Sequence, residues 1–353
     1  MKLVTATVLA VLLAGWITPS YADVASQQDL RRYAQTLQDN WSRFKQLYVK
    51  PDGRVVDTGN KGISHSEGQG YAMLVAASLG DHRTFQPMLR WTQNTLQRSD
   101  GLHAWRYNPA SRPAVDDPGS ASDAELLIAW ALLRAERRWP GHNYEARALR
   151  ILGALRKSLV THLGQKLVLM PWEGAQAADP VVINPSYFVF PALQDIAVYT
   201  QDDFWVALYE DSMDIVQAAR FGRYALPPDW LALGPTGRFS TWSERPARFG
   251  YDAIRIPLYL AWAGHRSDAF LGRFDGFWGQ FPAKVPAWVE LNNSSRPKYA
   301  KYEYHKGFAS VRRFAMHMYQ GHKLGGPPRV EGGGDYYSNI LLLLSQLAAR
   351  EQA

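Results

Sequence analysis

The stretch ASDAELLIAWALLRAERRW, residues 121–139, has the features of a long helix with a defined beginning. Ser122 is a natural N-cap, and Asp123 and Glu125 then fall in the first turn, where acidic side chains complement the helix dipole. The apolar side chains that follow recur with helical spacing from 124 to 138. The stretch therefore predicts a helix whose N-terminus carries two carboxylates.

The same helical spacing recurs along nearly the whole chain and predicts eleven helices in all. The ten further stripes cover residues 30–44, 70–79, 85–96, 144–160, 187–199, 204–219, 253–263, 270–278, 308–319 and 336–349. Alternating strand-like patterns are short and lie near residues 166–170. No Pro/Ser-rich linker or charge block divides the chain, and no repeat of fixed period is visible. We therefore expect one all-α domain, a layered helical toroid over residues 23–353.

Composition excludes several classes of protein. The 353 residues are 46% hydrophobic and 20% charged, as in globular proteins. The 39 Lys and Arg against 32 Asp and Glu are scattered, which disfavours nucleic-acid binding. The absence of cysteine excludes disulfides, iron–sulfur clusters, thiolate zinc sites and a cysteine nucleophile.

The N-terminal segment, residues 1–22, is predicted to be a secretory signal peptide. Lys2 is followed by an apolar stretch from 3 to 17, and Ser20-Tyr21-Ala22 is a small-x-small ending. A membrane anchor is the alternative, but the apolar stretch is shorter than a spanning helix requires. No later segment is long and apolar enough to span. We expect an exported protein that is periplasmic or secreted and does not span a membrane.

Acidic residues stand at three predicted helix starts. Glu67 lies in SHSEGQGY (residues 64–71), where Ser66 is the expected cap, and Asp252 lies in FGYDAIR (residues 249–255). Each motif alone fits an ordinary helix N-terminus. Together with residues 121–125, however, acids stand at three predicted helix starts, and alternate helices of a toroid begin at one rim. We therefore expect the acids to meet in one cleft.

Aromatic residues accompany these acids. The chain has 13 Trp, 18 Tyr and 14 Phe, and Trp105 and Tyr251 lie close in sequence to the acidic motifs. Most of the aromatic side chains are expected in the core. The remainder would offer flat faces for stacking on sugar rings, whose hydroxyl groups need carboxylates, amides and Arg. An aromatic, acidic cleft indicates a glycan site.

These motifs, taken in order, resemble glycoside hydrolase family 8. Residues 121–139 resemble its helix signature, with Glu125 where the family usually has Asp, which leaves the local contacts of that side chain open. The general-acid motif is similar to residues 64–71, a tyrosine segment to NPSYF (184–188), and the general-base segment to YDAIRIP (251–257). The periplasmic endoglucanases that accompany bacterial cellulose synthases are most similar.

The resemblance implies an (α/α)6 barrel of six inner and six outer helices, and hydrolysis of β-1,4-glucan with inversion. Glu67 would be the general acid, kept protonated by a water-poor, apolar setting, and Asp252 the general base. The other site residues would bind substrate or orient these two. Asp123 would distort the sugar, Tyr187 would hold the water or ring, Arg255 would orient Asp252, and Trp105, Tyr251 and Trp172 would contact sugar.

Neither a metal nor another cofactor is implied, since the sequence has no HExxH or EF-hand spacing. The alternatives are a non-catalytic subunit that binds or guides glycan, and a xylanase of the same family. A polysaccharide lyase on the same barrel would need a Tyr or His base, whereas acids dominate these motifs. The expected partners are a β-1,4-glucan chain and the cellulose synthase complex.

Overall fold

Helices dominate the computed structural model, which describes residues 21–292, 298 and 305–353. The α-helices of these residues are α1 (Tyr21–Ala34), α2 (Leu37–Tyr48), α3 (Ser66–Leu79), α4 (His82–Thr95), α5 (Ser122–Arg138), α6 (Tyr144–Ser158), α7 (Phe190–Thr200), α8 (Asp203–Ala218), α9 (Arg255–Trp262), α10 (Arg273–Trp278), α11 (His305–Gln320) and α12 (Tyr336–Glu351). Two 3-10 helices cover Ala175–Ala177 and Pro185–Tyr187, and a π-helix covers Asp268–Gly272.

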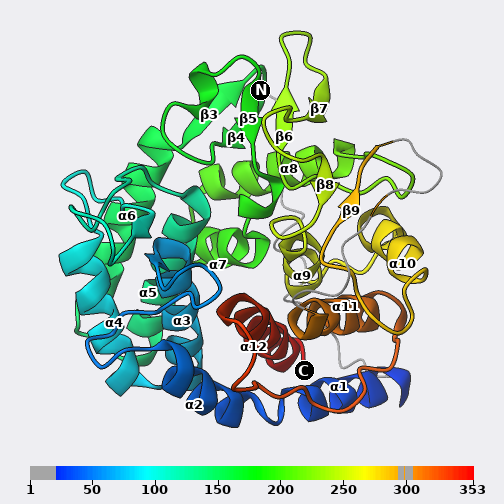
Figure 1. Cartoon of the computed structure of the whole chain (residues 1–353), viewed down its shortest axis with the longest axis horizontal. Coiled ribbons are helices and arrows are strands. Elements are labelled where there is room, and N and C mark those ends of the chain that lie inside the picture. Colours follow the sequence, from blue (N-terminus) through cyan, green and yellow to red (C-terminus); the bar gives the residue numbers. More distant parts are fainter. Residues whose placement is uncertain (1–20, 293–297, 299–304) are drawn as a thin grey trace.

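The helices are arranged in a ring. In Figure 1 the chain passes from α2 through α3 to α6, then through α7, α8 and α9, and returns to α11 and α12. The last helix, α12, packs against α1, α2 and α3, and so joins the end of the chain to its beginning. This arrangement is the predicted all-α toroid, an (α/α)6 barrel.

Helices near the middle of the ring are buried on all sides. Nearly every side chain of α3, α5, α9 and α12 is buried, whereas α4 and α6 bury one face. A helix that is apolar all round has to be enclosed by others, and an amphipathic one covers them from outside. The α3 and α5 helices approach closely at Gly70, where an added Cβ would lie 2.8 Å from the Leu127 Cβ.

The helix count is twelve among the described residues, one more than the eleven stripes predicted. The stripe over 30–44 is two helices, α1 and α2, separated by a turn at residues 35 and 36. Apolar spacing continues across that turn, so periodicity alone does not detect it. The predicted signal peptide lies largely outside the described residues and stays a prediction.

Short antiparallel strands lie in the connections between helices. They are β1 (Ser64–His65), β2 (Arg106–Tyr107), β3 (Val160–Leu163), β4 (Lys166–Leu169), β5 (Val181–Ile183), β6 (Leu231–Leu233), β7 (Phe239–Thr241), β8 (Arg248–Phe249) and β9 (Val289–Glu290). The pairs are β1–β2, β3–β4 and β8–β9, and β5, β6 and β7 form one small sheet in that order. The predicted strand near 166–170 is confirmed as β4.

Three of these strands lead directly into segments that the sequence analysis singled out. Strand β1 ends one residue before α3, β5 ends one residue before the segment 184–188, and β8 ends shortly before Asp252. Pairing of these strands fixes the backbone that enters the barrel rim. Of the helices in the described ranges, none has both the length and the apolar character needed to cross a membrane.

Candidate active site

One buried guanidinium joins the three predicted acids. Arg255, 2% exposed, is the first residue of α9. Its Nη1 pairs with the Glu67 carboxylate and lies 3.1 Å from Asp123 Oδ2. Its Nη2 lies 2.9 Å from Asp252 Oδ1. The convergence of the three acidic motifs, which the sequence analysis predicted, is therefore present, and Arg255 contacts Asp252 as expected.

Helix starts position these carboxylates. Glu67 and Asp123 are each the second residue of their helices, α3 and α5, and these helices pack against one another. Asp252 lies in a turn three residues before the first residue of α9. The acids are thus held by backbone at one end of the barrel, where helix dipoles favour negative charge.

The predicted caps, Ser66 and Ser122, are wrong by one position. Extended backbone continues to His65 and Ala121, which are the N-cap residues, so each serine is already the first helical residue. The Nδ1 of His65 accepts a hydrogen bond from the Gly68 backbone N–H at 2.9 Å. Ala121 has no side-chain oxygen and caps without one.

His65 links the general-acid motif to the cavity wall. Because its Nδ1 accepts from a backbone N–H, the neutral ring carries its proton on Nε2. That Nε2 lies 3.5 Å from Asp57 Oδ2, and Nδ1 lies 3.7 Å from Glu67 Oε2. The imidazole therefore fixes the first turn of α3 and stands beside the Glu67 carboxylate.

The segment 184–188 reaches the same guanidinium. Asn184 Oδ1 accepts from the Ser186 backbone N–H at 3.0 Å and from its hydroxyl at 2.7 Å. Ser186 Oγ in turn accepts from Arg255 Nη2 at 2.8 Å. The Tyr187 ring centroid lies 5.6 Å from the Arg255 guanidinium carbon. Burial raises the pKa of the Tyr187 hydroxyl well above its usual value, and the neighbouring carboxylates raise it further.

The acids outnumber the cation that they share. Burial raises the pKa of Asp123, which is 2% exposed, to about 8. Burial also raises the pKa of Asp252 to about 7, and the negative charge of Asp229 adds to this increase. Carboxylates that share one cation resist complete ionisation, since a like charge nearby disfavours the charged form. The cluster therefore retains a proton near neutral pH.

The surroundings of Glu67 differ from the expectation. An apolar setting was predicted, but its carboxylate contacts the Arg255 guanidinium and accepts a hydrogen bond from the Tyr71 hydroxyl at 3.1 Å. The Tyr71 and Tyr259 hydroxyls are 2.7 Å apart. The immediate contacts of the Glu67 carboxylate are therefore polar, and the apolar setting that was predicted does not surround it.

A cavity of about 360 Å³ opens over these groups. Glu67, Asp252, Arg255 and Tyr251 lie on its wall, as predicted for site residues. The remaining wall comes from β1 and the loop before it, and from the start of α12 with its N-cap; these residues are Asp57, Gly59, Asn60, His65, Asp335 and Tyr337. The cavity is therefore strongly acidic, as a site for an uncharged polyhydroxyl ligand with an acid–base pair would be.

Three further predicted aromatics lie nearby but do not line this cavity. Trp172 packs in a half-buried cluster with Trp230, at 5.7 Å between ring centroids, and with Trp242, at 6.2 Å. Tyr187 joins this cluster through Trp230, at 6.0 Å. Trp105 is half-buried, and its carbonyl accepts from the Ser66 backbone N–H at 3.0 Å, which ties its loop to the start of α3.

Glu125, the departure from the family motif, has an internal role. It is fully buried and accepts from the His103 backbone N–H at 2.6 Å, while its other oxygen lies 2.8 Å from His103 Nδ1. The longer side chain therefore anchors the connection before β2 and does not enter the cavity. Its contacts are now defined, and they are structural.

Several neighbours were not predicted as site residues. Asp229 and Trp230 precede β6 and contact the Asp252 region, and Tyr259 and Tyr337 come from α9 and α12. The sequence prediction was based on four acidic and aromatic motifs in a fixed order. These four side chains were not among the motif residues on which it relied. Only the aromatic content of those segments gave any signal.

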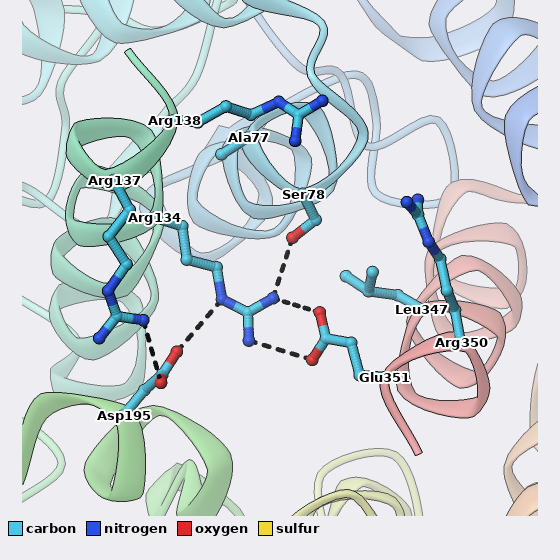
Figure 2. A pocket seen from close by; sticks show the side chains of 9 residues that line it. All are labelled: Ala77, Ser78, Arg134, Arg137, Arg138, Asp195, Leu347, Arg350 and Glu351. Carbon is cyan, nitrogen blue, oxygen red and sulfur yellow. Dashed lines mark hydrogen bonds and ion pairs between the residues drawn. The ribbon is translucent and has the colours of Figure 1, made fainter. Parts of the chain in front are cut away.

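A larger hollow, of about 660 Å³, lies at the other end of the barrel helices. Figure 2 shows Arg134 at its centre, bonded to Ser78, Asp195 and Glu351. Arg137 also bonds Asp195. Its carboxylates are thus paired with arginines, and none of the predicted site residues lies in its wall. The smaller acidic cavity is the candidate active site.

Comparisons with known proteins identify the family of this chain. Residues 15–351 match the family described as glycosyl hydrolases family 8. A protein of Novacetimonas hansenii described as a probable endoglucanase is 41% identical over 316 residues, which are 88% of this chain and 90% of that protein.

Two solved structures are similar over most of the chain. The endoglucanase Cel10 of Klebsiella pneumoniae has a TM-score of 0.83 and 36% identity, over 89% of this chain and all of that one. The endo-β-1,4-glucanase CMCax of Acetobacter xylinum has a TM-score of 0.79 and 38% identity, over 90% of this chain and 99% of that one. On these matches, and on the ordered acidic motifs that meet at Arg255, the chain belongs to glycosyl hydrolases family 8.

Proposed function

We propose that this protein is an endoglucanase that hydrolyses internal β-1,4 bonds of glucan with inversion at the anomeric carbon. The observation that carries the proposal is the placement of Glu67 and Asp252 on one cavity wall, bonded to different terminal nitrogens of the same guanidinium. The relatives described as endoglucanases support the choice of substrate.

In this mechanism Glu67 donates a proton to the glycosidic oxygen as the bond to the anomeric carbon breaks. Asp252 takes a proton from a water molecule that attacks the same carbon from the opposite face. Inverting enzymes use two carboxyl groups in this way and leave room for the water between the base and the sugar. A pKa of about 7 suits Asp252 to accept a proton near neutral pH.

The other predicted residues have supporting roles. Asp123 hydrogen-bonds and distorts the sugar at the bond to be cleaved, and Arg255 keeps the carboxylates separate and oriented. Tyr187 packs between the guanidinium and the tryptophan cluster, where it holds the water or the ring. The flat faces of Trp172, Tyr251 and Trp105 are proposed sugar contacts. These assignments involve only side chains and require no metal.

A non-catalytic glycan-binding subunit is the principal alternative. It would use the aromatic side chains, but it would gain nothing from carboxylates whose ionisation is made difficult by burial. A xylanase of the same family would share the acid–base pair and differ in the sugar that it accepts. Product analysis on carboxymethylcellulose, mixed-linkage glucan and xylan separates these two enzymes.

The decisive experiment follows the anomer that forms first. Proton NMR during early turnover of a cello-oligosaccharide is expected to show the α product before mutarotation mixes the anomers. Asp252→Ala should abolish this turnover, and azide should not restore it. A β product first, together with rescue by azide, would make Asp252 a nucleophile and contradict the inverting mechanism.

The cellular setting is a separate part of the proposal. The predicted signal peptide supports export to the periplasm, where the enzyme would cut or trim β-1,4-glucan during cellulose synthesis and secretion, in association with the cellulose synthase complex. Cell fractionation and co-purification with the synthase test these two points. Recovery of the protein only in the cytoplasm would contradict both.

A further inference from the structure

The segment that carries Asp252 lies between β8 and α9 and is held by another acid. Asp229 is 3% exposed, and its Oδ1 accepts hydrogen bonds from three backbone N–H groups. The donors are Gly250 at 2.9 Å, Asp252 at 3.2 Å and Ala253 at 2.9 Å. Asp229 Oδ1 therefore accepts hydrogen bonds from three of the four backbone amides of the 250–253 turn.

The second oxygen of Asp229 is held from the same loop. Arg248 Nε donates to Oδ2 at 3.0 Å, and the Asp229 backbone N–H donates to the Arg248 carbonyl at 2.8 Å. An added Cβ at Gly250 would lie 2.9 Å from Oδ2, so the carboxylate lies directly against this residue. Glycine at 250 is the residue that allows the approach.

Two other contacts fix the same turn from different directions. The indole of Trp230, the neighbour of Asp229 in sequence, hydrogen-bonds to the Asp252 carboxylate. The Tyr337 hydroxyl, from α12, donates to the Tyr251 carbonyl. Asp229 and Trp230 thus hold the backbone and the side chain of Asp252 respectively.

We infer that Asp229 is a positioning residue for the reaction, because its carboxylate binds the backbone amides of the 250–253 turn and stands directly against the segment that carries Asp252. This inference rests on the proposed function, in which Asp252 is the general base. It adds a residue that touches neither substrate nor water and acts only through the base. A misplacement of about 1 Å can cost about 10²-fold in rate.

Several ionisable groups face Asp252, so the effect of Asp229 has to be separated from theirs. They are Arg255, Arg248, Glu67, Asp123, Tyr187 and Tyr337, together with Asp229 itself. After burial, the charge of Asp229 is the largest contribution that raises the pKa of Asp252. Removing that charge while keeping the other groups lowers the pKa of the base. The acidic limb of kcat/KM then moves to lower pH.

The test compares two substitutions at 229 with the same two at Asp81. Asp229→Asn removes the charge but keeps an oxygen that can accept the turn amides, whereas Asp229→Ala removes both. Asp81 is the matched control, because it also accepts a backbone N–H, from Thr84, as the N-cap of α4, and it does not line the cavity. All variants are assayed on a cello-oligosaccharide below their own unfolding temperatures.

Asp229→Asn is expected to move the acidic limb to lower pH and to keep most of kcat. Asp229→Ala is expected to lose about 10²-fold in kcat with a smaller change in KM, while both Asp81 variants keep the parental limb and kcat. If Asp229→Ala does not fold, the position of the acidic limb of the kcat/KM profile in Asp229→Asn decides the question. An unmoved limb in Asp229→Asn overturns the inference. If Asp252→Ala itself stays active, the proposed function fails instead.

Discussion

The two ends of the inner helices carry opposite charges and differ in how these charges are paired. At the N-terminal end of α3 and α5, three carboxylates surround the single guanidinium of Arg255. At the C-terminal end of α3, α5 and α12, arginines surround Asp195 and Glu351 (Figure 2). The helix dipole favours this division of charge, since acids stabilise N-termini and cations stabilise C-termini.

What differs between the ends is the number of cations available to the carboxylates. Asp195 accepts from Arg134, Arg137 and the Trp130 indole, at 2.6 Å in the last case. Glu351 is bonded by Arg134 and by the Trp262 indole at 2.8 Å. The acids at the other end compete for one cation, so protons remain within reach of substrate. We therefore expect the larger hollow to be structural and the smaller one to be the reactive site.

The largest effect is expected from removing the transferable proton. Glu67→Gln should lower kcat on an unactivated β-glucan by about 10²–10⁴-fold, with the fold intact, and a substrate with an activated leaving group should be partly spared. Glu351→Gln is the matched control at the opposite end and should retain parental kcat. Equal activity of Glu67→Gln and the parent in a reducing-end assay would remove Glu67 as the acid.

A smaller effect is expected from pH: a rise in pH should increase activity and decrease the stability of the fold. Activity should rise as pH increases through about 7, because Asp252 must be ionised to act as base. Burial raises the pKa of Asp123 from its ordinary value of 3.8 to about 8, so Asp123 stabilises the fold at low pH and loses this contribution as pH rises toward 8.

Chemical denaturation over this pH range measures the stability part. Asp123→Asn should remove some of the loss of unfolding free energy between about pH 4 and pH 8, since it cannot ionise. Identical slopes for Asp123→Asn and the parent would contradict the charge competition proposed for the N-terminal end.

The smallest effect on catalysis is expected at the C-terminal end. Arg134→Met leaves Asp195 and Glu351 short of a partner and should cost about 1–3 kcal/mol of unfolding free energy. Both carboxylates keep an indole donor and partial access to water, which limits the loss. The kcat of the folded variant should equal that of the parent. A fall in kcat without a fall in stability would show that this end contributes to catalysis.

The sequence predicted the acids of the site better than their surroundings. Glu67, Asp123 and Asp252 were identified because each stands at a predicted helix start, in a motif that resembles the family; in the structure Asp252 lies in a turn three residues before α9. Asp229 escaped detection because its role depends on three amides of a loop some twenty residues away. No local spacing encodes such a contact.

The same limit applies to the fold. The apolar stripes located nearly every helix, but the stripe over 30–44 continues through the turn between α1 and α2. The serine caps were misplaced because extended backbone reaches His65 and Ala121 before the helices begin. Periodicity reports which face is buried, whereas boundaries depend on dihedral angles that neighbouring strands impose.

The close approach of the helices that carry Glu67 and Asp123 depends on a glycine one turn below these acids. Gly70 follows Glu67 by three residues on α3 and touches Leu127, four residues after Asp123 on α5. A methyl group at position 70 would push α3 and α5 apart, and the carboxylates of Glu67 and Asp123 at their N-terminal ends would move apart with them. The absence of a side chain at Gly70 thus keeps the acid on α3 close to the carboxylate that is proposed to bind the sugar on α5.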